Sequence, residues 1–176
     1  MRMSLCLDVG VSATLALCFA AQAQETCGSA TPIGVGTTAF VAGATTNDNP
    51  GASCTPTSTN DVFFTFTPAS SGNYSFETCN TAPGFFDTVL SVYSGACGAT
   101  TQLGCADDSG CGTNGWSSRI INLALTGGTT YIVRIAAYDA GSLGDGNGVI
   151  TIAGGAAPPA NDLCVNAQVV GTRPRI

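Results

Sequence analysis

Residues 85–118 carry the clearest structural signals of the chain, in the order FFDTVLSVYSGACGATTQLGCADDSGCGTNGWSS. Residues 87–93 alternate apolar and polar side chains, which predicts a half-buried β-strand. A glycine-rich segment bounded by Cys97 and Cys105 follows and reads as a turn, and the acidic pair Asp107 and Asp108 comes next. The strand, the cysteines and the acidic loop together predict a β-rich domain that is cross-linked by disulfides.

The same alternation recurs on both sides of this stretch. In the segment 119–125, Ile121, Leu123 and Leu125 are expected to share one face, and 126–129 reads as a tight hairpin turn. About eight short strands with turn signals between them and no helical period predict an all-β fold, an antiparallel β-sandwich with jelly-roll-like connections. Strands are expected at 35–44, 61–67, 73–79, 87–93, 119–125, 130–138 and 149–153.

The composition restricts the functions that the chain can have. Its 176 residues are enough for one domain of ordinary size with its own core. Only 9% of the residues are charged, Lys and His are absent, and the net charge is −6. This balance argues against nucleic acid and against an anionic membrane as partners. The absence of His also removes the commonest general base and metal ligand.

The N-terminus has the features of a secretory signal peptide. Arg2 precedes an apolar run over 9–21, and small residues precede a cleavage position after Ala23. At about a dozen apolar residues the run is shorter than a membrane-spanning helix, and the alternative is a first hydrophobic strand of the fold. We expect residues 1–23 to be removed, the mature protein to begin at Gln24, and the product to be secreted or displayed at the cell surface without membrane insertion.

Export to an oxidising compartment makes disulfides the expected state of the cysteines. Two of the nine cysteines lie in the signal segment, and six of the other seven fall inside one domain. The spacing lacks the paired CxxC motifs of a metal cluster. Local proximity favours the pairs Cys97–Cys105, Cys27–Cys54 and Cys79–Cys111, although six cysteines can pair in many ways.

The C-terminal part repeats a pattern from the start of the domain. Residues 153–159 have the composition of a linker, and 161–167 align with 24–30, each segment with one cysteine. This favours a sandwich over 24–154, followed over 155–176 by a linker and the truncated start of a second repeat, with Cys164 left unpaired. The alternative is a chance resemblance between two short segments.

Seven phrases, in order, also resemble a known kind of module. They are Cys27 with Ala30, ATTN (44–47), DVFFTF (61–66), FETC (76–79), FDTVLSVY (86–93), CADD (105–108) and LTGGTTY (125–131). The set resembles the pre-peptidase C-terminal (PPC-like) domain, in the cysteine-bearing form found as tandem repeats in secreted bacterial proteins. It covers nearly all of 24–154.

The resemblance implies a non-catalytic β-sandwich that is appended to secreted hydrolases or arranged in arrays on large surface proteins. Some relatives bind calcium or extracellular polymers. This chain departs from the pattern at Ala106, where such relatives often have Asn, and that loss of an oxygen donor weakens the implied calcium site. No peptidase domain accompanies the module in this sequence.

Asp87, Asp107 and Asp108 are the candidate metal ligands. If the strand that follows Asp87 begins beside the acidic loop, these three carboxylates converge, and their hard oxygen donors suit calcium. The chain has no EF-hand loop, because the twelfth position from Asp107 is Ser118 rather than Glu. The alternative is that Asp107 and Asp108 accept backbone N–H groups in a tight turn.

Trp116, the one tryptophan, is the candidate ligand-binding residue. If exposed it could stack on a sugar or anchor a protein partner, and if buried it belongs to the core. Catalysis is not expected, since adjacent Asp side chains point apart and the serines have no His or Lys as a base.

The sequence therefore predicts a non-enzymatic extracellular module that acts as a spacer or adhesive unit beside neighbouring repeats in a larger protein. The alternative is a calcium-dependent accessory domain of a secreted hydrolase, with an extracellular polysaccharide or protein as its partner.

Overall fold

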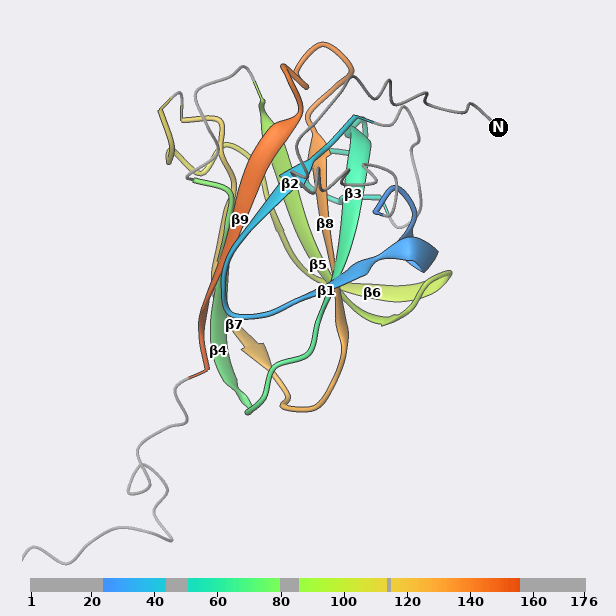
Figure 1. Cartoon of the computed structure of the whole chain (residues 1–176), viewed down its shortest axis with the longest axis vertical. Coiled ribbons are helices and arrows are strands. Elements are labelled where there is room, and N and C mark those ends of the chain that lie inside the picture. The colour runs from blue at the N-terminus through green and yellow to red at the C-terminus, as the bar shows by residue number, and fades with distance from the viewer. Residues whose placement is uncertain (1–23, 44–50, 80–85, 114, 156–176) are drawn as a thin grey trace, which may run out of the picture.

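The computed structural model describes residues 24–43, 51–79, 86–113 and 115–155, which form two β-sheets packed face to face (Figure 1). The segments expected to be the signal peptide, most of the linker and the second repeat lie outside these residues. One 3-10 turn and nine strands are described: η1 (Cys27–Ser29), β1 (Thr31–Ile33), β2 (Gly36–Val41), β3 (Thr59–Phe66), β4 (Gly72–Glu77), β5 (Thr88–Ala96), β6 (Ala99–Ala106), β7 (Arg119–Leu125), β8 (Tyr131–Ala137) and β9 (Asn147–Gly154).

The strand order is that of a jelly roll. One sheet has the order β1-β3-β8-β5-β6 and the other β2-β9-β4-β7. Successive strands from β2 onward alternate between the sheets except at the β5–β6 hairpin, and every pair is antiparallel apart from β1 with β3. This topology confirms the predicted antiparallel sandwich. The short β1 and the edge strand β6 were not predicted, and β6 occupies most of the segment expected to be a glycine-rich turn.

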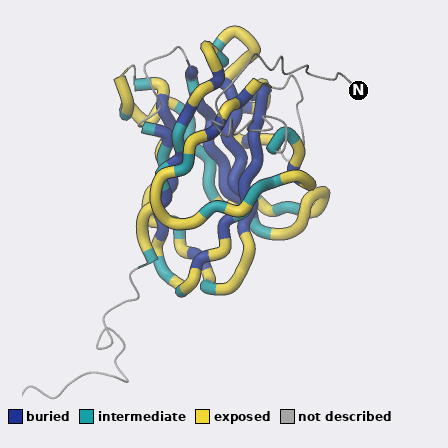
Figure 2. Tube along the Cα trace, in the orientation of Figure 1, coloured by how far each residue is buried: buried dark blue, intermediate teal, exposed yellow. Residues whose placement is uncertain are grey.

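The core lies between the two sheets and is rich in aromatic rings. Alternate residues of β3 and β4 point into it, and Phe66 packs edge-on against Phe76 with ring centroids 5.5 Å apart. A second, smaller cluster lies on the outer face of the five-stranded sheet, where Cys27 of η1 covers Phe63, Tyr93 and Ile132. The central strands are thus buried on both faces, as Figure 2 shows, which explains why every residue of β8 is buried.

A buried ion pair crosses this outer face. Arg134 of β8 donates from Nε to Asp61 Oδ2 of β3 at 2.7 Å, and both side chains are at most 2% exposed. The guanidinium also donates from Nη1 to Ser58 Oγ at 2.9 Å. Because buried charges are tolerated only when paired and hydrogen-bonded, this network fixes the loop 51–58 against the sheet.

Strand β7 departs from the predicted pattern. Asn122 has a positive φ of 54°, and the β4–β7 register shifts at this point. A bulge adds one residue and reverses which side chains face the core. Ile120 is therefore buried and Ile121 is 63% exposed, so the prediction that Ile121 shares the inner face is wrong. The segment 126–129 is not a hairpin either, because β7 and β8 belong to different sheets and the turn connects the two layers.

All six cysteines of the domain form disulfides: Cys27–Cys97, Cys54–Cys105 and Cys79–Cys111, with Cα–Cα distances of 5.8, 5.9 and 5.2 Å. The predicted pair Cys79–Cys111 is confirmed. The predicted pairs Cys97–Cys105 and Cys27–Cys54 are wrong, because Cys97 lies in the β5–β6 turn whereas Cys105 lies near the far end of β6. At about 3.3 Å per residue these two are roughly 25 Å apart, well beyond the reach of a disulfide.

None of the described residues belongs to a helix that is long and apolar enough to span a membrane.

Candidate metal centre and aromatic patch

Three neighbouring strands of the five-stranded sheet end at one edge, and the acidic residues lie there. Asp87 immediately precedes β5, Asp107 and Asp108 immediately follow β6, and Asp139 follows β8 closely. Because β5 is antiparallel to both neighbours, its start lies beside their ends. Asp87, Asp107 and Asp108 each offer a carboxylate oxygen within 4.8 Å of the others. We call these three residues the acidic cluster; the structure brings together the residues that the sequence singled out.

The loop that carries Asp107 and Asp108 is held by backbone hydrogen bonds and a disulfide. Ser109 N donates to Ser117 O at 2.9 Å, and Thr88 N donates to Trp116 O at 3.2 Å. The Cys79–Cys111 disulfide ties the same loop to the end of β4. The acidic cluster is thus attached directly to β5 and β6, and the cross-linked loop ties it to the end of β4.

Beneath the cluster lies a set of fully buried hydroxyl groups. Thr78 Oγ1 and Thr88 Oγ1 are 2.6 Å apart, and Ser118 Oγ donates to Ala106 O at 3.0 Å and also to Thr88 O. Ser118 N donates to Thr78 Oγ1 at 3.0 Å. These contacts join β4, β5, β6 and the start of β7, so the hydroxyls have a structural role. Ser118 has no His or Lys to act as its base, because the chain contains neither.

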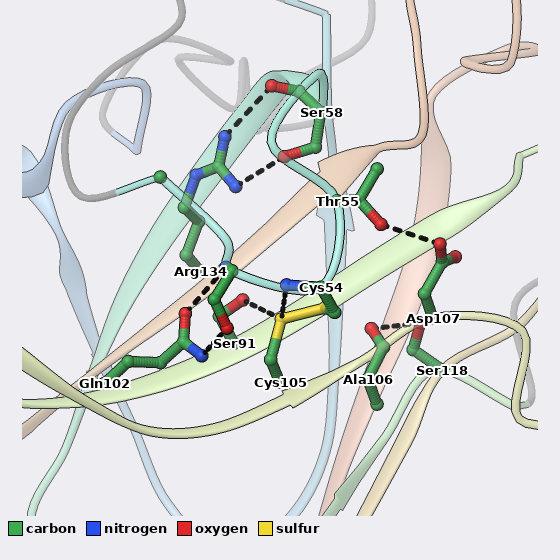
Figure 3. Close-up of a disulfide and its surroundings, with 12 residues drawn as sticks. Cys54, Thr55, Ser58, Ser91, Gln102, Cys105, Ala106, Asp107, Ser118 and Arg134 are labelled. Carbon is green, nitrogen blue, oxygen red and sulfur yellow. Dashed lines mark hydrogen bonds between the residues drawn. A yellow bond between two sulfur atoms is a disulfide. The ribbon is translucent and has the colours of Figure 1, made fainter.

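The loop 51–58 reaches the cluster from the outer face. Thr55 Oγ1 donates to Asp107 Oδ2 at 2.7 Å, beside the Cys54–Cys105 disulfide (Figure 3). The disulfide fixes Cys54 to β6 two residues before Asp107, so it places Thr55 within reach of the carboxylate. Because Cys54 was expected to pair with Cys27, this connection between the loop and the cluster was not predicted.

The electrostatics of the cluster favour a bound cation. Asp87 Oδ1 and Asp107 Oδ1 are buried, and neither atom has a hydrogen-bond partner among the described residues. Partial burial, followed by the negative charges of Asp108, Asp107 and Asp139, raises the pKa of Asp87 from 3.8 to about 6. A buried carboxylate oxygen without a partner costs free energy that a coordinated cation would offset. The donor set, carboxylate oxygens on loops, fits calcium.

Two residues with exposed aromatic side chains have their backbones bonded on either side of the cluster. Trp116 is 41% exposed, so the interpretation of this residue as core is wrong. Tyr138 is 42% exposed, and its N–H donates to Asp87 O at 3.0 Å. Sequence reasoning missed Tyr138 because it placed this residue inside a strand; only the pairing of β8 with β5 shows that it lies beside Asp87. We call Trp116 and Tyr138 the aromatic pair.

Comparisons with known proteins identify no family. No family model matches the chain, and no curated protein matches it. One solved structure that it resembles is the CBM35 from Cellvibrio japonicus Abf62, with 18% identity and a TM-score of 0.35 over 69% of this chain and 89% of that chain. A likeness this low carries no argument about function. The resemblance to PPC-like domains accordingly stays a prediction from the sequence.

Proposed function

We propose that this chain is a non-catalytic extracellular β-sandwich module that binds calcium at the joined ends of β5, β6 and β8. The observation that carries the proposal is the convergence of Asp87, Asp107 and Asp108, two of which have a buried carboxylate oxygen without a hydrogen-bond partner among the described residues. Three disulfides support an oxidising compartment, which agrees with the signal peptide that the sequence predicts.

The role favoured for the module is that of a polymer-binding accessory domain. An aromatic side chain that is exposed beside polar groups is a common anchor for a ligand, whereas a spacer has no need to expose one. Trp116 lies beside the acidic cluster and is 41% exposed. The second candidate, a spacer or adhesive unit among tandem repeats, is supported by the disulfides and by the resemblance of 161–167 to 24–30.

The chemistry of the described residues supports a role without catalysis. The carboxylates lie next to one another at one edge of a sheet rather than across a cleft, and Ser118 is occupied by backbone carbonyl groups. Acid–base hydrolysis of a glycosidic bond needs two carboxyl groups on opposite sides of the bond.

Thermal unfolding in the presence and absence of calcium tests the proposal. Extracellular calcium modules commonly bind with a Kd of about 0.1–1 mM. At ten times the Kd, the ligand stabilises the fold by about 1.4 kcal/mol, which raises Tm by about 3–6 °C for a domain of this size. EGTA should reverse the shift, and magnesium should give a smaller one. An unchanged Tm at millimolar calcium would overturn the proposal.

A further inference from the structure

We propose that Trp116 and Tyr138 form a two-ring platform for a neutral polysaccharide, which names the polymer class for the module; the inference rests on the proposed function. The β5–β8 register pairs Thr88 with Ala137. One step further along this register places Tyr138 opposite Asp87, and the hydrogen bond from Tyr138 N to Asp87 O at 3.0 Å agrees with this pairing. Tyr138 is therefore a cross-strand neighbour of the acidic cluster.

Trp116 flanks the start of β5 on the other side. Successive N–H groups of a strand point to opposite sides, and Thr88 N donates to Trp116 O at 3.2 Å, away from β8. Since paired strands are about 4.8 Å apart, the backbones of Trp116 and Tyr138 are separated by about 10 Å, with the acidic edge between them. A chain of several linked sugar rings spans such a separation.

The backbones of the two aromatic residues are hydrogen-bonded to adjacent residues at the start of β5, Tyr138 to Asp87 and Trp116 to Thr88. This attachment lowers the backbone conformational entropy that the two residues lose when a ligand binds. The rings supply flat apolar faces for the C–H face of a sugar, and the carboxylates between them accept hydrogen bonds from its hydroxyl groups. A sugar chain can stack its C–H faces on the rings and donate hydrogen bonds from its hydroxyl groups to the carboxylates at the same time.

Charge decides between classes of polymer. The chain has no Lys, and the two arginines among the described residues are paired, Arg119 with Glu77 and Arg134 with Asp61. The patch therefore offers no basic side chain for a uronate or sulfate group, and because the three carboxylates outnumber the two positive charges of a calcium ion, the remaining negative charge repels such a group. With calcium bound, the negative charge of the acidic cluster is largely neutralised, so a basic protein is not strongly attracted either. A neutral, hydroxyl-rich chain fits best.

The test measures depletion of the secreted chain from solution by insoluble cellulose, mannan and chitin in calcium. Alginate gel and poly-lysine beads serve as the anionic and cationic probes. W116A and Y138A should each weaken binding to at least one neutral polysaccharide about tenfold or more. Y138F should retain most of the binding because it keeps the ring. I121A is the matched control, since Ile121 is 63% exposed on the four-stranded sheet, and it should bind like the parent chain.

Calcium-dependent thermal shifts of the same samples separate the two proposals. If the parent chain and the variants gain stability from calcium but none of the neutral polysaccharides depletes the parent chain, the inference is overturned while the calcium site stands. Binding to alginate or poly-lysine alone overturns the polymer class. Equal losses for I121A and W116A overturn the location. The absence of any calcium shift is instead a failure of the proposed function.

Discussion

Replacing Asp87 with Asn should stabilise the calcium-free domain and abolish its response to calcium. Burial and three neighbouring carboxylates raise the pKa of Asp87 to about 6 in the folded state. The folded pKa exceeds the unfolded value of 3.8, so the contribution of Asp87 to stability is most favourable below about pH 4, falls as pH rises toward about 6, and stays reduced above it. Asp87 therefore opposes folding at neutral pH as long as no cation is bound.

The size of this effect follows from the same shift. Two pKa units correspond to about 3 kcal/mol for a fully buried group. Asp87 is only partly buried, and solvent screens its repulsion from the neighbouring carboxylates, so about 1 kcal/mol is a better expectation. D87N should thus raise Tm in EGTA at pH 7 by about 3–5 °C. It should also remove the calcium-dependent rise in Tm, because a cluster ligand is lost.

Circular-dichroism melts of the parent chain and D87N from pH 4 to pH 7, in EGTA and in calcium, measure both effects. D145N is the matched control: it removes one negative charge outside the cluster, and Asn can still accept the bond from Asn147 N. It should retain the calcium response. A lower Tm for D87N in EGTA, or a calcium shift as large as that of the parent chain, would refute the reasoning.

Two further predictions concern the groups that hold the outer face. R134A leaves the buried Asp61 carboxylate without its cation and should destabilise the domain by about 3–5 kcal/mol in urea unfolding, whereas a cost under about 1 kcal/mol would contradict the buried pair. The double variant C54S/C105S should lose about 2–4 kcal/mol of unfolding free energy. It should also bind calcium more weakly in calorimetry, because the loop no longer holds Thr55 against Asp107. An unchanged calcium affinity would show that this disulfide does not support the site.

Alternation in the sequence was enough to predict the central strands and the sandwich. It failed where the backbone departs from regular pairing. Asn122 forms a bulge that exchanges the inner and outer residues of β7, and a bulge leaves the hydrophobic pattern ambiguous. Strand β6 escaped prediction because it is an edge strand whose residues are mostly polar or small and none of which is buried.

The disulfides and the site depend on contacts between residues that are distant in the sequence. Cys27 reaches Cys97 only because η1 packs on the outer face of the five-stranded sheet, and this arrangement follows from strand order. The acidic residues could be singled out because they flank the strand and the glycine-rich segment of residues 85–118, but their convergence follows from the antiparallel pairing of β5 with β6, a strand that was not predicted. Tyr138 could not be found without the β5–β8 register, which periodicity does not reveal.

Terbium luminescence excited through tryptophan tests the central claim most directly. Tb³⁺ occupies oxygen-rich calcium sites and emits strongly when an indole lies close, and Trp116 is the one tryptophan of the chain. The account predicts saturable terbium emission, which should disappear as calcium displaces the bound terbium. D87N should reduce the emission sharply. W116F should remove it while leaving the calcium-dependent rise in Tm. Absence of sensitised emission from the folded, disulfide-bonded chain, or emission that calcium does not displace, would contradict a calcium site at the ends of β5, β6 and β8.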